Sequence, residues 1–364
     1  MAIYGKRHQV QIAREHARPR TAPWIGRAQR ESFVERLIGA PDMEAIRRSS
    51  MEMHIPIPIW GTGAFVYKGD MYPVIAGGAG FSSLSDLISE ATTGGKLQQL
   101  GFSKVGATGV VGRASTLWYA GNIPGVGATA AALAAGTNHT RATAGAIGPQ
   151  KNAAGGDTLH LLKADGGISV AAQPLLLYDR IWAGEPLITS AVAQTVTMTP
   201  TRYETTGAAG TSKGNMVFAE VRTTLGAATP NLTLQYVDDS GNAPENAAAV
   251  VGITGAVTPT FPYGSAALGL MFIPLNAGDA GVSDITQWTQ SVSYVSGAYA
   301  IVLAHPLLWI PAVMLANGGY IIDGINSAFN LQRVYDDACL ALLEPIRPVT
   351  TATTYQGMLT MCSG

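Results

Sequence analysis

The chain has 364 residues, and it is poor in charge for its length. Hydrophobic residues make up 47% of it, but charged residues make up only 13%, half of the ~25% found in typical soluble domains. A coiled coil is excluded because it needs abundant Glu and Lys, and a disordered charged tail because the net charge is only −1. Two cysteines, Cys339 and Cys362, exclude a disulfide-dense scaffold and a multi-cysteine metal site.

Two long stretches without acidic, lysine or arginine side chains, 246–278 and 285–322, raise the question of a membrane protein. Prolines interrupt both stretches, and Ser, Thr, Gln and Gly dilute them. Neither supplies the ~20 predominantly apolar residues that a spanning helix needs. The first twenty residues lack the apolar segment of a secretory signal. We therefore expect no membrane contact and no secretory signal.

Positive charge is concentrated in the first 50 residues, which contain 10 of the 23 Lys and Arg but 5 of the 24 Asp and Glu. This pattern predicts a basic arm, residues 1–80, in front of a slightly acidic body. Three roles remain open for it: clamping a neighbouring protein subunit, which we favour, forming a solvated and partly helical leader, or contacting nucleic acid. The last role is the least supported because no aromatic interleaving or nucleic-acid motif is present.

The segment HIPIPIW (54–60) follows the basic part of the arm. Proline at every second position removes hydrogen-bond donors, so we expect an extended strap at a sheet edge and not a central strand. Isoleucine and tryptophan side chains would anchor it. The arm and strap together supply the candidate interaction residues, which are Arg14, Arg18, Arg20, Trp24, Arg27, Arg30, Ile55, Ile57, Ile59 and Trp60.

Residues 81–195 are predicted to form a β-rich, Gly/Ala-rich domain. Its one clear helix covers 85–90, where acidic residues occupy the first turn and two glycines follow at 94–95. Short apolar runs at 104–111, 117–119, 159–162 and 168–172 favour strands. The Ala/Gly/Thr-rich stretch up to residue 156 is of low complexity, and we expect it to be a surface loop, ordered only against a partner.

Residues 196–345 carry alternating patterns, best seen where Leu232, Leu234 and Tyr236 alternate with polar or β-branched residues. Such alternation at 10–20-residue spacing predicts an antiparallel β-sandwich domain. The candidate strands are 191–199, 215–224, 231–238, 247–254, 268–274 and 291–303. Apolar residues at helical spacing predict an amphipathic helix over 329–343, with Cys339 on its buried face. Residues 346–364 are expected to be a C-terminal tail.

The predicted fold class is therefore mainly β: an antiparallel β-sandwich body with an extended, partly helical N-terminal arm and a few short helices.

No catalytic constellation emerges from the sequence. The segment TGGKL (93–97) lacks the hydroxyl residue of a phosphate loop, and the six histidines are scattered singly. Asp238, Ser240 and Asn242 imitate the start of a calcium loop, but Ala249 stands where a bidentate Glu is needed. We expect no catalytic residue, no cofactor and no metal, so the chain is predicted not to be an enzyme. A charge-poor body instead suits a subunit of a large symmetric assembly.

Seven short motifs carry a family resemblance. They are FSSLSDLI (81–88), LW (117–118) with GNIPGVG (121–127), LYDRIW (177–182), TLG (224–226), LQY (234–236) with GN (241–242), PLNAGDAGV (274–282) and DACLALL (337–343). In this order they resemble virion structural proteins of tailed bacteriophages. The resemblance spans about 80–345 and leaves the arm outside. It implies a head-associated protein, either a capsid subunit or a capsid decoration (cement) protein.

The resemblance further implies that the partners are copies of this chain and other virion proteins, in a virion assembled in the bacterial host cytoplasm. It brings no catalytic residues. One alternative is a tail, baseplate or fibre-adaptor protein. Another is a carbohydrate-binding or hydrolytic β-sandwich on the virion surface, which would need an aromatic platform or a carboxylate pair; no such pair stands at a recognisable spacing.

Overall fold

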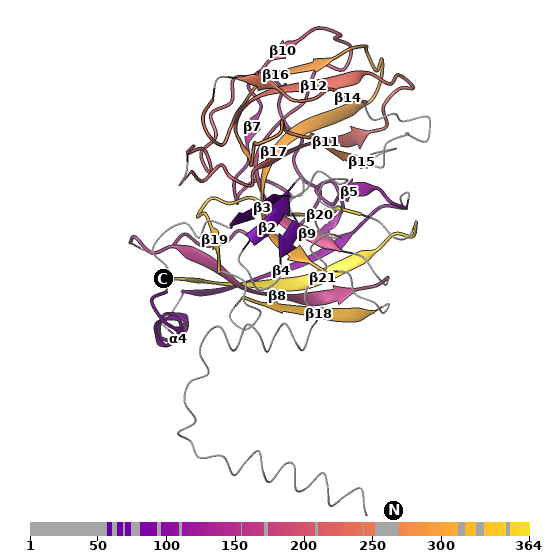
Figure 1. Cartoon of the computed structure of the whole chain (residues 1–364). Helices are drawn as coiled ribbons and strands as arrows, with labels where there is room; N and C mark the ends of the chain where they lie inside the picture. The colour runs from indigo at the N-terminus through magenta and orange to yellow at the C-terminus, as the bar shows by residue number, and fades with distance from the viewer. Residues whose placement is uncertain are drawn as a thin grey trace, which may run out of the picture. The chain divides into compact units, whose positions relative to one another are not determined.

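A computed structural model describes residues 57–59, 64–67, 70–73, 81–92, 96–108, 111–153, 155–170, 174–207, 210–242, 244–251, 269–311, 317–324, 331–346 and 350–364. All of them belong to one compact unit, Arg47–Gly364. The described residues form antiparallel sheets and one helix (Figure 1). The mainly β, antiparallel fold class predicted from the sequence is confirmed.

The helix α4 (Leu84–Thr92) begins where the sequence places a cap. The Ser83 hydroxyl accepts a hydrogen bond from the Asp86 amide at 3.1 Å, and the Asp86 carboxylate accepts one from the Ser82 amide at 2.8 Å. These bonds satisfy amide groups that have no partner within the first turn. Leu87 is buried beside Cys362 and Leu162. The helix predicted over 85–90 is therefore confirmed.

One sheet of six strands takes its middle strand from the C-terminal part of the chain. Its order is β18 (Gly318–Asp323), β8 (Leu159–Ile168), β21 (Thr354–Ser363), β4 (Leu97–Val105) and β6 (Asn122–Ile123), and β19 (Gln332–Val334) also pairs with β8. Figure 1 shows β8, β18 and β21 side by side. A tail was predicted at 346–364, but β21 is bonded on both sides, and buried Tyr355, Leu359 and Met361 alternate along it.

A second sheet closes on itself. Its path runs β17 (Ala298–Ile310), β11 (Met216–Thr223), β15 (Gly269–Phe272), β5 (Ala114–Thr116), β20 (Leu340–Glu344) and β9 (Leu175–Gly184), with β7 (Thr137–Asn138) beyond β9. Because β17 also pairs with β9, six strands form a closed ring. We call this the strand ring. It combines strands from both sides of the domain boundary predicted at 195/196.

A third sheet is the clearest part of the predicted sandwich. It contains β10 (Gln194–Thr195), β16 (Val282–Gln290), β12 (Asn231–Asp238), β13 (Glu245–Asn246) and β14 (Val250–Val251). Leu234 of β12 pairs with Trp288 of β16, and both side chains are fully buried. This sheet shares a core with one face of the strand ring, because Leu234 and Trp288 belong to the same cluster as Ile301 and Leu303 of β17.

The remaining sheet has three strands, β1 (Ile57–Ile59), β2 (Ala64–Tyr67) and β3 (Asp70–Pro73). β1 lies at its edge and pairs with β2 alone within the sheet. Residues 57–59, the described part of the strap, are thus extended and at an edge, as the prolines require; the rest of the strap lies outside the described residues.

The helix predicted over 329–343 is wrong. Residues 332–334 form β19, and 340–344 form β20, which is buried along its whole length. Apolar residues in a strand covered on both faces do not alternate with polar ones, so their spacing can imitate a helix. Cys339 is fully buried, as expected, but in a turn region before β20.

β16 lies where the sequence predicts no strand. Thr and Gln occupy several of its less buried positions, and these polar residues hide the pattern of a strand.

The small-residue stretch predicted as a surface loop covers the core directly. A Cβ added to Gly136 of this stretch, where φ is +58°, would lie 2.1 Å from Trp182, and one added to Gly127, just before the stretch, would lie 2.3 Å from the Trp118 ring. Leu133 and Ile147 of the same stretch are buried. Glycine is needed at both positions because it alone lets the backbone lie against an indole ring.

Candidate functional site

Of the candidate interaction residues, only Ile57 and Ile59 lie within the described part, in β1. Arg14, Arg18, Arg20, Trp24, Arg27, Arg30, Ile55 and Trp60 lie outside the described residues. The interaction role assigned to these ten residues therefore stays a prediction.

The interior of the strand ring contains a salt bridge that is completely buried. Arg180 of β9 donates from Nη2 to Oε1 of Glu220 on β11 at 2.5 Å, and both side chains have 0% exposure. The two residues reach across β17, where they pair with Ala304 and Ala300. Trp118 stacks on the guanidinium, 4.6 Å from its ring centroid. Small side chains on β17 leave the space that these two long side chains occupy.

A second buried pair lies one residue away on the same strand. Arg202 binds the Asp179 carboxylate with two hydrogen bonds of 2.8 and 2.7 Å, and the same carboxylate accepts a bond of 2.8 Å from the Cys339 amide. Arg202 also donates to the His139 carbonyl at 3.0 Å. The network joins β9, the segment before β20 and two loops. Both oxygens of the Asp179 carboxylate accept hydrogen bonds. A charged pair that is buried away from water requires such bonds.

These buried groups are not suited to proton transfer near neutral pH. Burial, together with the charges of Arg180 and Arg202, lowers the pKa of His139 to about 2. Burial lowers the pKa of His305 to about 3, and its ring stacks on Tyr203 at 3.9 Å. Neutral, enclosed imidazoles of this kind act as packing and hydrogen-bonding groups.

Three carboxylates meet at the end of β12. Asp238, Glu245 and Asp279 each place an oxygen within 4.8 Å of the others. Glu245 and Asp279 complete an arrangement that sequence spacing could not show, because they stand 7 and 41 positions beyond Asp238. Burial and the neighbouring carboxylates raise the pKa of Asp279 to about 6.

Protein groups already bind each of these three carboxylates. Asp238 accepts bonds from the Ser240 and Asn242 amides at 3.0 and 2.9 Å, as in the predicted turn. Glu245 accepts a bond from the Asn276 side chain at 2.9 Å, and Asp279 accepts one from the Tyr236 hydroxyl. The cluster therefore fixes the turn after β12 to the 276–280 loop.

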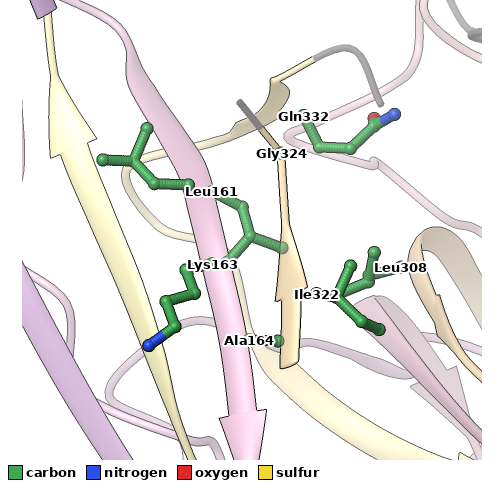
Figure 2. A pocket seen from close by; sticks show the side chains of 8 residues that line it. Leu161, Lys163, Ala164, Leu308, Ile322, Gly324 and Gln332 are labelled. Carbon is green, nitrogen blue, oxygen red and sulfur yellow. The ribbon is translucent and has the colours of Figure 1, made fainter. Parts of the chain in front are cut away.

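A small hollow lies between β8, β17 and β18 (Figure 2). Leu161, Ala164, Leu308 and Ile322 supply apolar groups to its wall. Lys163 points its amine away from this wall, as Figure 2 shows, and forms a salt bridge with Asp165 at 2.5 Å. The hollow has no acid–base pair and no nucleophile, so its lining supports packing rather than chemistry.

A buried lysine shapes the loop GNIPGVG (121–127). Lys104 of β4 is 2% exposed, and its ammonium donates to the carbonyls of Ala120 and Gly125, each at 3.0 Å. Burial lowers the pKa of this lysine to about 8. The loop held in this way leaves Ile123 and Val126 exposed, at 59% and 58%.

Four exposed apolar side chains lie on two hydrogen-bonded loops next to the third sheet. Leu187, Val192, Val292 and Val295 are exposed by 62%, 69%, 45% and 79%. We call these four residues the loop-end patch. The Tyr294 amide and the Gln290 side chain both donate to the Ile188 carbonyl, at 3.0 and 2.6 Å, which ties the two loops together.

The two loops that carry the loop-end patch contain no charged residue, and the partly exposed Glu185–Arg222 salt bridge stands just before the first of them. The stretches 186–201, 223–237 and 285–304 contain no Asp, Glu, Lys, Arg or His. Centres of protein interfaces are depleted in charged residues in the same way. The sequence shows these uncharged stretches separately, and the structure brings them together, because β10 and β12 both pair with β16.

The chain was compared with family models, curated proteins and solved structures. No family model and no curated protein matches the chain. A structure of the Gt strain of infectious bursal disease virus aligns with 73% of this chain and 80% of its own, at 9% identity and a TM-score of 0.15. A D431N mutant VP2 protein of the same virus, from derived T=1 particles, aligns with 73% of this chain and 40% of its own, at 11% identity and a TM-score of 0.11. Similarity at this level defines neither fold nor function.

Within the described part of the chain, none of the helical segments has the length and apolar character needed to cross a bilayer.

Proposed function

We propose that this chain is a structural subunit of a virus particle, and more specifically a head component of a tailed bacteriophage, either a capsid subunit or a decoration protein. Its work would be mechanical and not enzymatic: it would occupy contacts between subunits, and the basic arm would clamp neighbours. The observation that carries this proposal is the loop-end patch, an apolar surface that a tightly hydrogen-bonded, uncharged pair of loops presents to its surroundings.

The motifs that resemble phage virion proteins support a shared architecture. Asp179, Arg180 and Trp182 of one motif are buried in or beside the strand ring, and Leu234 and Tyr236 of another are buried in the third sheet. Residues of this kind maintain a fold. The exposed apolar residues, apart from those at α4 and in the 121–127 loop, lie outside the motifs, so the contacts they make would be particular to this chain.

The interior chemistry supports a static role. Both buried salt bridges are enclosed, and the buried imidazoles are neutral over the physiological pH range. The Asp179 carboxylate, which accepts bonds from Arg202 and from the Cys339 amide, stabilises one arrangement of the strands around it.

Mass spectrometry of purified virions tests the proposal. We expect peptides of this chain in intact heads, at a copy number comparable to that of the capsid subunits. A much lower copy number would place the chain in the tail, baseplate or fibre adaptor instead. Absence from purified particles would refute a virion role altogether.

Deleting residues 1–46 tests the arm, since every described strand and helix lies after them. We expect a folded protein that no longer stays attached to particles during purification. Full retention of the shortened chain would show that residues 1–46 of the arm do not clamp neighbours.

A further inference from the structure

The salt bridge inside the strand ring uses only part of its hydrogen-bonding capacity. Arg180 donates to Glu220 from Nη2, but its Nε and Nη1 have no partner among the described residues, and neither has Oε2 of Glu220. Arginine is always charged and carries a donor on every guanidinium nitrogen. Because buried polar atoms are almost always hydrogen-bonded in folded proteins, these three atoms require a partner.

The side chains around the pair are poorly suited to be that partner. Arg180 and Glu220 pair across the sheet with Ala304 and Ala300 of β17, whose side chains are single methyl groups. Trp118 covers the face of the guanidinium, whereas the N–H groups of Arg180 lie in the guanidinium plane. Methyl groups neither donate nor accept, and the stacked indole leaves the edge of the guanidinium uncovered.

Two tyrosine hydroxyls are buried close to the pair. Burial raises the pKa of Tyr119, the Glu220 carboxylate raises it further and the Arg180 charge lowers it, so the hydroxyl lies near both. This hydroxyl has no partner among the described residues. Burial raises the pKa of Tyr178 and the nearby Arg180 charge lowers it, although the two groups do not meet the geometry of a hydrogen bond.

The His139 imidazole adds a donor and an acceptor beside the guanidinium. Burial, together with the charges of Arg180 and Arg202, lowers its pKa, so the ring is neutral and one nitrogen carries a proton while the other accepts. Neither nitrogen bonds to any part of the chain that the structure describes. The imidazole meets the Trp118 ring edge-on, with centroids 5.3 Å apart, and the same indole stacks on Arg180.

We propose that a small network of ordered water molecules binds inside the strand ring and bonds to these unpaired atoms. The set contains both donors and acceptors, and water is a ligand that does both. An anion would meet the Glu220 carboxylate, and a cation would meet the Arg180 guanidinium, so a charged occupant always faces its like. The inference concerns the interior of the fold and does not depend on the proposed function.

Removing one hydroxyl separates a hydrated interior from a dry one. If water bonds to Tyr119, Tyr119→Phe breaks that bond, so we expect the urea midpoint of unfolding to fall. In a dry interior the same change removes a buried, unpaired polar group, and the midpoint would rise. Tyr320→Phe is the matched control. Its hydroxyl is buried without a described partner but lies against backbone, 2.7 Å from a Cβ placed on Gly166, so its midpoint should rise or stay unchanged.

Oxygen-17 relaxation dispersion of the full chain detects long-lived bound water directly. We expect a smaller dispersion amplitude in Arg180→Met with Glu220→Met, because the unpaired charged atoms are gone. Glu185→Met with Arg222→Met should leave the amplitude unchanged, since that pair is partly exposed and its water exchanges quickly. Chloride should shift the urea midpoint of the unaltered chain no more than that of Arg180→Met with Glu220→Met.

An unchanged dispersion amplitude in Arg180→Met with Glu220→Met would overturn the inference. So would a midpoint that rises in Tyr119→Phe, or one that falls equally in Tyr119→Phe and Tyr320→Phe. A chloride effect confined to the unaltered chain would identify the occupant as an anion and overturn it as well. If the double variant does not fold, Tyr119→Phe and its control decide the question alone.

Discussion

Replacing Glu220 by methionine removes one half of the salt bridge inside the strand ring. Arg180 would then keep its positive charge at 0% exposure, with the Trp118 ring still stacked on its guanidinium. Breaking a buried pair in this way costs about 3–5 kcal/mol of unfolding free energy, because the remaining ion has neither bulk water nor a counter-charge. We expect Glu220→Met to fall within that range.

The chain contains a matched control on neighbouring positions. Arg222 of β11 binds Glu185, just after β9, with two hydrogen bonds of 2.8 and 2.9 Å, but the two side chains are 32% and 20% exposed. Water can solvate Arg222 when its partner is lost. Glu185→Met should therefore cost about 0–1 kcal/mol, the usual range for exposed pairs.

Urea unfolding followed by tryptophan fluorescence gives both free energies in one experiment. The double variant Arg180→Met with Glu220→Met should recover most of the loss, since an apolar pair needs no desolvation of charge. Equal costs for Glu220→Met and Glu185→Met would refute the reasoning, and so would a double variant that is less stable than Glu220→Met alone.

Two further predictions concern packing and pH. Gly127→Ala should destabilise the chain by about 1–3 kcal/mol, because its Cβ would overlap the Trp118 ring, whereas Gly125→Ala should be neutral, with nothing within 4 Å of its Cβ; urea midpoints compare the two. His305 has a pKa of about 3 when folded and about 6.5 when unfolded, so the unfolded state binds more protons between these values, and stability should fall as pH falls from 6.5 to 3. The fall should be smaller in His305→Gln, which can still bond to Asn215, and identical pH profiles would contradict this.

The fold class could be predicted because several strands are covered by core on one face and water on the other. β12 is the clearest case: buried Leu232, Leu234 and Tyr236 alternate with half-exposed residues. α4 could be predicted from its capping residues. In both, the information lies within a few neighbouring residues, which is the range that periodicity and capping rules cover.

Other elements depend on contacts that no local pattern encodes. β9 and β20 are buried on both faces within the strand ring, so they show no alternation, and the second was mistaken for a helix. The glycines that pack on Trp118 and Trp182 resemble a loop sequence until their partners are known. The loop-end patch was missed for the same reason: Leu187 and Val295 stand 108 positions apart in the sequence, and their loops are joined by hydrogen bonds to the Ile188 carbonyl.

The position of β21 has a consequence for how this protein is made. β8 and β4 are joined only by β21, and residues 169–353 must be synthesised between the end of β8 and the start of β21. At about 5–20 residues per second, the nascent chain carries two unpaired strand edges for roughly 10–40 s. During that interval the growing chain is open to pairing with other chains on the same polysome. A ribosome-associated chaperone, or the removal of residues 354–364, should therefore change the yield of soluble protein far more than a substitution in any edge strand.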